Sequence, residues 1–293
     1  MKHKDIFSAT IPLASDSITT VCSSEPRKQK NCDGKGPASG TGALIINADD
    51  FGRDQLTTDR ILDCGLAGGI SSVSAMVFME DSERAAAIAE DRGIDTGLHL
   101  NFTTPFSSAG APTQLKDHQL QLARHLKRHR LANLVFHPRL TGSFEYVVRK
   151  QLDEFFRLYG VEPGRIDGHH HMHLCTNVIA AKLLPAGTIV RRNFSFQPGE
   201  KSWANRSYRS FVDHLLSQRH RVTDYFFSLP PLEPADRVRR IFSLSRQFTV
   251  EVETHPINPA EHRFVTGGEI FRFAGDLRVA DRFALPCAVG AAA

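Results

Sequence analysis

The chain has 293 residues, of which 41% are hydrophobic and 23% are charged. This balance is typical of a chain that folds around a core, and the length allows one large domain or two small ones. A net charge of +4 is only mildly basic, so it does not by itself indicate a nucleic-acid partner. No apolar run approaches the roughly 18 residues that a membrane span needs, so we predict no membrane span.

Five cysteines are spread along the chain without a CxxC pair. An odd and widely spaced set is typical of free thiols in a reducing compartment. The first residues include lysines, but their apolar stretch is broken by Ser8, Thr10 and Pro12, and no small-residue cleavage site follows. We therefore expect a cytoplasmic protein, with secretion as the weaker alternative.

Residues 1–41 differ in composition from the rest of the chain, being polar and dense in Gly, Pro, Lys, Ser and Thr. Such a segment buries too little apolar surface to offset the entropy lost on ordering. We expect a disordered extension over 1–41, followed by a single domain over 42–293.

Strand and helix patterns alternate along the rest of the chain. Strands are predicted at 43–47, 71–79, 96–102, 165–169, 187–192 and 248–255. Helices are predicted at 57–67, 81–90, 144–159, 177–184 and 235–243. This order favours parallel strands, in an α/β barrel or a doubly wound sheet.

A long excursion over 103–139 interrupts the alternation and is typical of a substrate loop. It contains a basic helix at 116–130. That helix has no interleaved aromatic residues on which bases could stack, so a solvated helix face is the favoured interpretation. No nucleic acid is expected as a partner.

The run DGHHHMH at 167–173 holds four histidines and lies in mid-chain, unlike an affinity tag. Strand alternation places four of its side chains on one face: Asp167, His169, His171 and His173. That geometry lapses where the strand ends, so His169 is the best-supported metal ligand. The roles of His170, His171 and His173 stay open.

Adjacent carboxylates follow the first predicted strand, in Asn47-Ala48-Asp49-Asp50-Phe51-Gly52. Each raises the pKa of the other, so the pair is costly without a cation. A metal ion on one of them relieves the repulsion and leaves the other as a base. A turn with a helix cap is the structural alternative.

Two further strand ends carry histidines. His99 closes an apolar run, where a lone histidine is more often a core residue than a ligand. The last strand ends in Glu251-Val252-Glu253-Thr254-His255-Pro256, and its alternation puts Glu251, Glu253 and His255 on one face. In a barrel this polar face points inward.

Together these stretches place an aspartate and three histidines at the carboxyl ends of four parallel strands. Barrels and open parallel sheets build their active sites there, so we predict a metal-dependent enzyme. Two imidazoles and one carboxylate around a divalent ion leave positions open for water and substrate. Imidazoles favour Zn²⁺ or another transition ion over Mg²⁺, which prefers oxygen ligands.

Five motifs carry a family resemblance: IINADDFG at 45–52, GISSVSAMV at 69–77, TGLHLNFT at 96–103, DGHHHMH at 167–173 and THP at 254–256. With them the chain resembles the YdjC-like carbohydrate deacetylase family, which includes chitooligosaccharide and hopanoid-associated deacetylases, over about 43–275. The resemblance implies a distorted or incomplete (β/α) TIM-like barrel. It also implies hydrolysis of N-acetyl groups of amino sugars with a divalent metal, usually recorded as Mg²⁺.

Carried over to this chain, the family pattern implies Asp50, His99 and His169 as metal ligands, Asp49 as the base and His255 as the acid. The implied reaction is attack by metal-activated water, with Asp49 accepting a proton and His255 protonating the leaving amine. The implied substrate is an N-acetylated carbohydrate, free, in an oligosaccharide or in a glycoside.

The chain departs from the family pattern in its long amino-terminal extension, at Gly168 where serine is common, and in the text after the His-Pro. The last two departures concern substrate identity more than chemistry. Arg191 and Arg192, just past a strand, are candidates to bind the sugar or to hold Asp49 ionised, and at least one of them is expected at the surface. The oligomeric state is open, a homo-oligomer included.

Two other functions fit the same residues. One is a metal-dependent phosphoesterase, in which the basic 116–130 segment grips phosphate, but this predicts ligands for a second ion. The other is an inactive barrel that binds a metal or a partner, and the Asp49–Asp50 pair argues against it because a binding relic has no use for a base.

Overall fold

The structure is a computed structural model that describes residues 42–129, 131–196 and 200–285. The predicted extension at 1–41 lies outside these ranges. Within them, no helix is long and apolar enough to cross a membrane.

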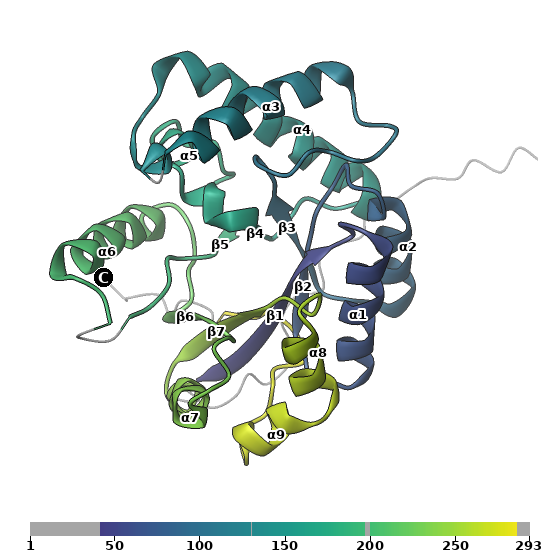
Figure 1. The fold of residues 1–293 in the computed structure, drawn as a ribbon, viewed down its shortest axis with the longest axis vertical. Coiled ribbons are helices and arrows are strands. Elements are labelled where there is room, and N and C mark those ends of the chain that lie inside the picture. The colour runs from purple at the N-terminus through teal and green to yellow at the C-terminus, as the bar shows by residue number, and fades with distance from the viewer. Residues whose placement is uncertain (1–41, 130, 197–199, 286–293) are drawn as a thin grey trace, which may run out of the picture. The chain divides into compact units, whose positions relative to one another are not determined.

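The described residues form a parallel seven-stranded sheet in the order β5-β4-β3-β2-β1-β7-β6 (Figure 1). The strands are β1 (Ala43–Phe51), β2 (Ser72–Ala75), β3 (Thr96–Leu100), β4 (Arg165–Gly168), β5 (Ile189–Val190), β6 (Tyr225–Ser228) and β7 (Thr249–Thr254). An isolated parallel bridge joins Ile189 of the edge strand β5 to Arg221, which precedes the other edge strand, β6. The curled sheet is therefore an incomplete barrel, which confirms the predicted fold class.

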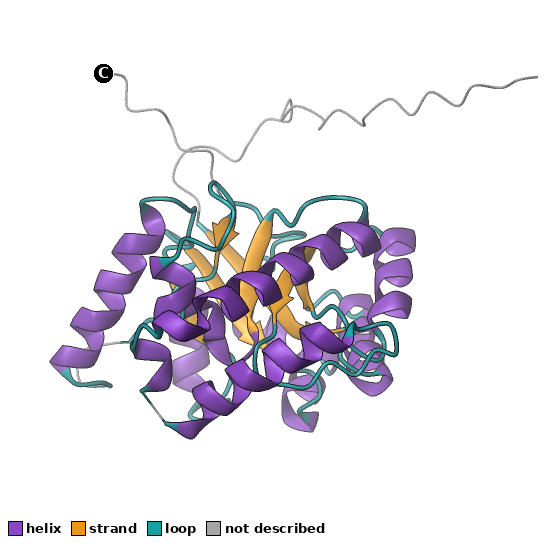
Figure 2. Ribbon diagram, turned by 90° about the horizontal axis from the view of Figure 1, so that it is seen from above, coloured by secondary structure: helices purple, strands orange, loops and turns teal. Residues whose placement is uncertain are grey.

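Helices surround the sheet (Figures 1 and 2). They are α1 (Gln55–Leu66), α2 (Ser82–Arg92), α3 (Thr113–Arg128), α4 (Thr141–Tyr159), α5 (Thr176–Ala180), α6 (Trp203–Ser217), α7 (Ala235–Leu244), α8 (Pro259–Thr266) and α9 (Glu269–Ala274). Short 3₁₀ helices add η1 (Ala132–Leu134), η2 (Pro138–Leu140) and η3 (His169–Leu174). Because strands of such a sheet are buried on both faces, they read as apolar runs, and β1 and β7 are buried along almost their whole length.

Part of the barrel interior is polar. Arg165 of β4 is 5% exposed and donates from Nη2 to Asn47 Oδ1 at 3.2 Å and to the Val73 carbonyl at 2.7 Å. Gly97 of β3 leaves room for this guanidinium, because a Cβ there would lie 2.7 Å from Arg165 Nε. A side chain at position 97 would therefore have to displace the guanidinium of Arg165.

The predicted elements are present, with shifted ends. The predicted strand at 71–79 stops at Ala75, and the predicted helix at 177–184 stops at Ala180. The sequence patterns did not predict β6, which has only four residues, or the helices α6, α8 and α9. These missed elements follow β5 or β7, where the alternating pattern is weakest.

Candidate metal centre

A local irregularity of β1 brings two adjacent carboxylates to one place. Neighbouring side chains of a regular strand point to opposite faces. The pairing of β1 with β2 shifts register between Ala48 and Phe51, and Asp50 has a φ of 71°, which is uncommon for any residue but glycine. As a result, Asp49 and Asp50 both approach His99, with His99 Nδ1 4.0 Å from Asp49 Oδ2 and His99 Nε2 3.3 Å from Asp50 Oδ1.

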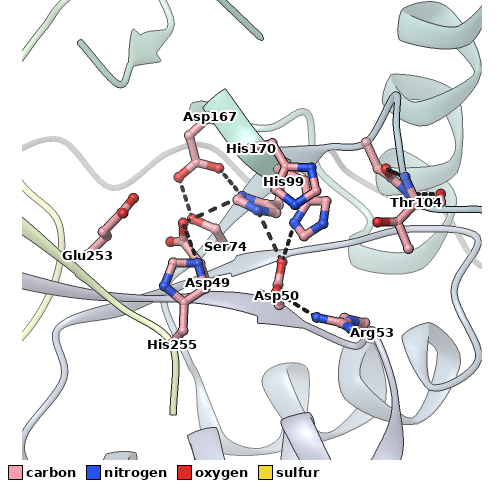
Figure 3. Close-up of polar contacts among 12 residues, drawn as sticks. Asp49, Asp50, Arg53, Ser74, His99, Thr104, Asp167, His170, Glu253 and His255 are labelled. Atoms are coloured by element: carbon pink, nitrogen blue, oxygen red, sulfur yellow. Dashed lines mark hydrogen bonds and ion pairs between the residues drawn. The ribbon is translucent and has the colours of Figure 1, made fainter. Parts of the chain in front are cut away.

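Three side chains form the cluster that we call the metal centre: Asp50, His99 and His169. Figure 3 shows Asp50 and His99 of this cluster together with Asp49, Asp167 and His255. They come from the ends of β1 and β3 and from the residue after β4, and all three are buried. His169 Nδ1 lies 2.9 Å from Asp50 Oδ1, and one donor atom from each residue lies within 4.8 Å of the others. The structure thus brings together the three residues that the family resemblance implied as ligands.

The donor set fits a divalent ion. His99 Nδ1 lies 2.8 Å from Asp167 Oδ1, while the buried His99 Nε2 makes no hydrogen bond to the described residues although it faces Asp50. A carboxylate on one ring nitrogen of a metal-bound histidine fixes the ring and leaves the other nitrogen for the metal. The orphaned Nε2 is therefore available as a ligand atom for such an ion.

The charge around this centre also calls for a cation. Five buried carboxylates lie in or around this centre: Asp49, Asp50, Asp167, Glu251 and Glu253. The buried Arg191 pairs with all of them except Asp50. Burial lowers the pKa of His99, but the charges of Asp167 and Asp49 outweigh it and raise that pKa to about 10. Burial raises the pKa of Asp50, and bonding to His169 and His99 reverses this and brings it well below its usual value.

Arg191 lies just past β5, is buried, and joins four carboxylates. Its Nη1 and Nη2 lie 2.6 and 2.8 Å from the two oxygens of Asp49, and Nη2 lies 2.8 Å from Asp167 Oδ2. Its Nε is 2.6 Å from Glu251, and Nη1 is 3.3 Å from Glu253. Burial raises the pKa of both glutamates, although the positive charge of Arg191 acts in the opposite direction.

The two candidate arginines thus differ. Arg191 is buried, leaves no exposed donor for a sugar, and pairs with Asp49. Arg192 is partly exposed, pairs with Asp213 at 2.9 Å and donates to the carbonyls of Thr223 and Asp224. Arg192 is therefore the one of the two arginines that reaches the surface, where at least one was expected.

His255 follows β7 and faces Asp49, with its Nε2 4.0 Å from Asp49 Oδ2 and 34% of its side chain exposed. Its backbone N–H donates to Glu261 Oε2 at 2.8 Å, which fixes the chain where the strand ends. Glu251 and Glu253 reach Arg191 from the same strand face, as the alternation predicted. Among the residues implied for catalysis, His255 is the one with substantial exposure to solvent.

The histidine run does not continue as a strand. β4 ends at Gly168, and His170 and His171 have φ values of 54° and 56° in the left-handed region. The expected single face for 167–173 therefore holds only up to the strand end. The ring of His170 lies on that of His169 with centroids 4.0 Å apart, and its Nδ1 contacts Thr103 Oγ1 at 2.9 Å.

The two other histidines of the run, His171 and His173, contact a carboxylate that pairs with Arg191 and the backbone of Arg191. His171 Nε2 is 3.6 Å from Glu253 Oε2, and His173 Nε2 donates to the Arg191 carbonyl at 2.9 Å. Burial lowers the pKa of His173 to about 4, so this histidine is neutral and positions the chain after β5.

Two residues of the site were missed as functional. Asp167 contacts His99, Arg191 and Ser74, the last at 2.6 Å. Asn47 donates from Nδ2 to Asp49 Oδ1 at 2.7 Å. The strand alternation could have indicated both of them. Asp167 stands two residues before His169 and Asn47 two residues before Asp49, so each shares a strand face with a residue that the family pattern implies for the site.

Comparison with known proteins agrees with this geometry. A family model described as YdjC-like protein matches residues 43–275, and the chain belongs to this family. It is 30% identical to a carbohydrate deacetylase of Danio rerio over 172 residues, which are 53% of this chain and 50% of that protein. It is 30% identical to a chitooligosaccharide deacetylase of Serratia marcescens over 132 residues, covering 45% of this chain and 50% of that one. The chain thus matches about half the length of these relatives.

A solved structure shares the fold. It is a protein of Enterococcus faecalis V583 whose suggested role is cellobiose-phosphate cleavage, with a TM-score of 0.58, 16% identity, and coverage of 83% of this chain and 97% of that one. At this identity the likeness concerns the fold alone.

Proposed function

We propose that the chain is a metal-dependent carbohydrate deacetylase, which hydrolyses the N-acetyl group of an amino sugar, free or in an oligosaccharide or glycoside. The observation that carries this proposal is the buried Asp50–His99–His169 cluster with its orphaned His99 Nε2, beside the Asp49 carboxylate. The names of the curated relatives support the same activity.

In this proposal Asp50, His99 and His169 hold one divalent ion. When bound, the ion supplies a Lewis acid that polarises the acetamide carbonyl and acidifies water. Two imidazoles favour Zn²⁺ or another transition ion, while the family resemblance implies Mg²⁺.

Asp49 serves as the base. Asn47 and Arg191 hold its carboxylate in one orientation, so it accepts the proton of the attacking water without first having to reorient. Arg191 also places a buried positive charge beside this carboxylate.

His255 serves as the acid. Its ring lies within 4.0 Å of Asp49 and is partly exposed, so a substrate bound over the metal centre can contact it. It delivers a proton to the departing amine, which is a poor leaving group as an anion.

A two-metal phosphoesterase is less well supported. The second group of possible ligands is Asp49, His99 and Asp167. Its two aspartates, however, are joined by the Arg191 guanidinium, with distances of 2.6 to 2.8 Å. A second cation there would have to displace a buried arginine.

The test is product analysis with the full-length protein loaded with Zn²⁺ or Mg²⁺. Acetate release is measured from a panel of N-acetylated glycans, and phosphate release from phosphorylated ones, with Asp49→Asn as the inactive control. Acetate release from at least one glycan, lost in the control, is the expected result. Phosphate release without acetate would support the phosphoesterase, and neither product would support a binding role.

A further inference from the structure

A chain of hydrogen bonds runs from Arg165, the first residue of β4, to Asp49, the proposed base. Its middle member is Asn47 of β1, whose side chain is fully buried. Arg165 Nη2 donates to Asn47 Oδ1 at 3.2 Å, and Asn47 Nδ2 donates to Asp49 Oδ1 at 2.7 Å. One amide side chain thus connects a buried guanidinium with the carboxylate that the proposed function assigns to proton transfer.

The orientation of the Asn47 amide depends on its charged neighbours. A guanidinium has only donors and a carboxylate accepts, so Arg165 requires the oxygen of the amide and Asp49 requires its nitrogen. Its other two neighbours are hydroxyls, which can donate or accept: Ser72 donates to Oδ1 at 2.6 Å, and Ser74 accepts from Nδ2 at 2.7 Å. The two serines can therefore pair with either orientation of the amide, and they do not fix it by themselves.

Arg165 is itself held in place from several sides. Its Nη2 also donates to the Val73 carbonyl at 2.7 Å, and its Nη1 lies 3.5 Å from Asp95 Oδ1. The guanidinium lies over the ring of Phe283, 4.6 Å from the centroid, and the Phe283 N–H donates to Asp95 Oδ2 at 2.7 Å. Contacts with three neighbours thus fix the donor that faces Asn47.

Asn47 adds a constraint on Asp49 that Arg191 does not supply. Arg191 contacts both oxygens of Asp49, Oδ2 at 2.6 Å and Oδ1 at 2.8 Å, so it treats them nearly alike. Asn47 bonds to Oδ1 alone, which leaves Oδ2 with fewer hydrogen bonds among the described residues. Oδ2 is also the oxygen that lies 4.0 Å from His255 Nε2. The amide therefore distinguishes a held oxygen from one that can accept a proton.

We propose that Arg165 is a positioning residue for the reaction: through the amide of Asn47 it holds Asp49 Oδ1 and leaves Oδ2 to accept the proton of water. Arg165 does not belong to the metal centre and acts through another side chain, so it is not a catalytic residue. The inference rests on the proposed function for the role of Asp49, whereas the hold of Arg165 on Asn47 can be measured without any activity.

The first test is a double-mutant cycle on the full-length, metal-loaded protein, with Arg165→Met, Asn47→Ala and the two combined. Arg165→Met should lose about tenfold in kcat on an N-acetyl sugar, with KM and metal content unchanged, because small misplacements of a reacting group are costly. The combined variant should lose no more than Asn47→Ala alone, since Arg165 acts through Asn47. Losses that multiply, or a change confined to KM or metal content, overturn the inference.

Two further variants complete the cycle. Arg165→Lys keeps a charged donor and should retain more kcat than Arg165→Met. It also replaces Arg165→Met in the cycle if the methionine variant does not fold, and its smaller loss should likewise vanish in the Asn47→Ala background. Arg149→Met, which removes an exposed arginine on α4, is the matched control and should leave kcat unchanged.

The second test measures the Asn47 amide directly, by nuclear magnetic resonance of protein labelled with ¹⁵N-asparagine. Absence of the signal in Asn47→Ala identifies it. The side-chain amide protons should exchange with water about tenfold or more faster in Arg165→Met than in the unmodified chain, because one of the groups that orient them is gone. The backbone amide of Asn47, seen in the same spectrum, should keep its rate. Equal side-chain rates overturn the inference.

The two proposals fail in different ways. Acetate release with losses that multiply in the cycle refutes the positioning role and keeps the deacetylase. Faster exchange of the Asn47 amide in Arg165→Met, without acetate release from any glycan by the unmodified chain, refutes the deacetylase and keeps the hold of Arg165 on Asn47.

Discussion

Arg191 and Asp49 form a two-point ion pair inside the barrel, with Nη1 2.6 Å from Oδ2 and Nη2 2.8 Å from Oδ1. The pair joins the chain after β5 to the end of β1, across the interior of the curled sheet. A bidentate pair of this kind fixes both the charge and the plane of the carboxylate. The contacts of Asp49 thereby differ from those of Asp50, its neighbour in sequence, which lies nearer to His99 and His169.

This difference gives the first prediction. Asp49→Asn should keep the metal ion and lose on the order of 10²–10⁴ in kcat for an N-acetyl sugar, because asparagine cannot accept the proton of water. Metal content by mass spectrometry and acetate release check it together. Asp153→Asn, with an exposed carboxylate on α4, is the control and should behave as the unmodified chain. Near-normal turnover in Asp49→Asn would show that another group is the base.

The second prediction concerns metal removal. His99→Ala and His169→Ala should each lose most of the bound divalent ion together with the activity, because each deletes one of about three protein ligands. Metal analysis after purification and after incubation with Zn²⁺ or Mg²⁺ checks this and also identifies the preferred ion. His214→Ala, exposed on α6, serves as the control. Full occupancy in both ligand variants refutes the ligand assignment.

The third prediction concerns Asp167, which contacts His99 Nδ1. Asp167→Asn should weaken metal affinity about tenfold to a hundredfold rather than abolish it, since it orients a ligand and is not one. Competition with a chelator of known affinity measures the change. Adding excess metal should restore part of the activity in this variant but not in His99→Ala. Equal behaviour of the two variants would contradict the distinction.

Much of the site follows from local sequence patterns. Asp49, His99 and His255 each close a strand, and the carboxyl ends of parallel strands converge at one end of the barrel. The sequence therefore predicted which residues meet there, although not their contacts. The bulge at Asp50, which aims two neighbouring carboxylates at one centre, has no periodic signature.

Long-range partners were harder to predict. Arg191 stands 142 residues from Asp49 in sequence, and nothing local distinguishes it from Arg192. Only the curl of the sheet makes one arginine a buried neighbour of four carboxylates and the other a partly exposed partner of Asp213.

The fourth prediction concerns the extension. Deleting residues 1–40 should leave folding and catalysis nearly intact, because that segment lacks the periodic apolar residues with which a segment docks on a core. Thermal unfolding and acetate release of the full-length and shortened chains check it. An insoluble shortened chain, or one that melts many degrees lower, would show that the extension packs on the barrel.

The last prediction concerns His255, whose partly exposed ring faces Asp49 from the end of β7. Because His255 is the proposed acid, the loss of kcat on removing it should be larger when the leaving group has a greater need for a proton. His255→Ala should lose on the order of 10²–10⁴ in kcat on an N-acetyl sugar, whose amine leaves poorly. An activated acetyl ester, whose leaving group is stable as an anion, should lose much less.

Three measurements separate this role from others. Metal content in His255→Ala should stay unchanged, because His255 is outside the three-residue cluster. His262→Ala, a partly exposed histidine on the following helix α8, should leave the ratio of amide to ester activity as it is. Because the His255 backbone N–H already bonds to Glu261, truncating the side chain should leave the strand end in place, which unfolding temperature can verify. Equal losses on the amide and the ester would make His255 a structural residue, and a loss of metal would make it a ligand.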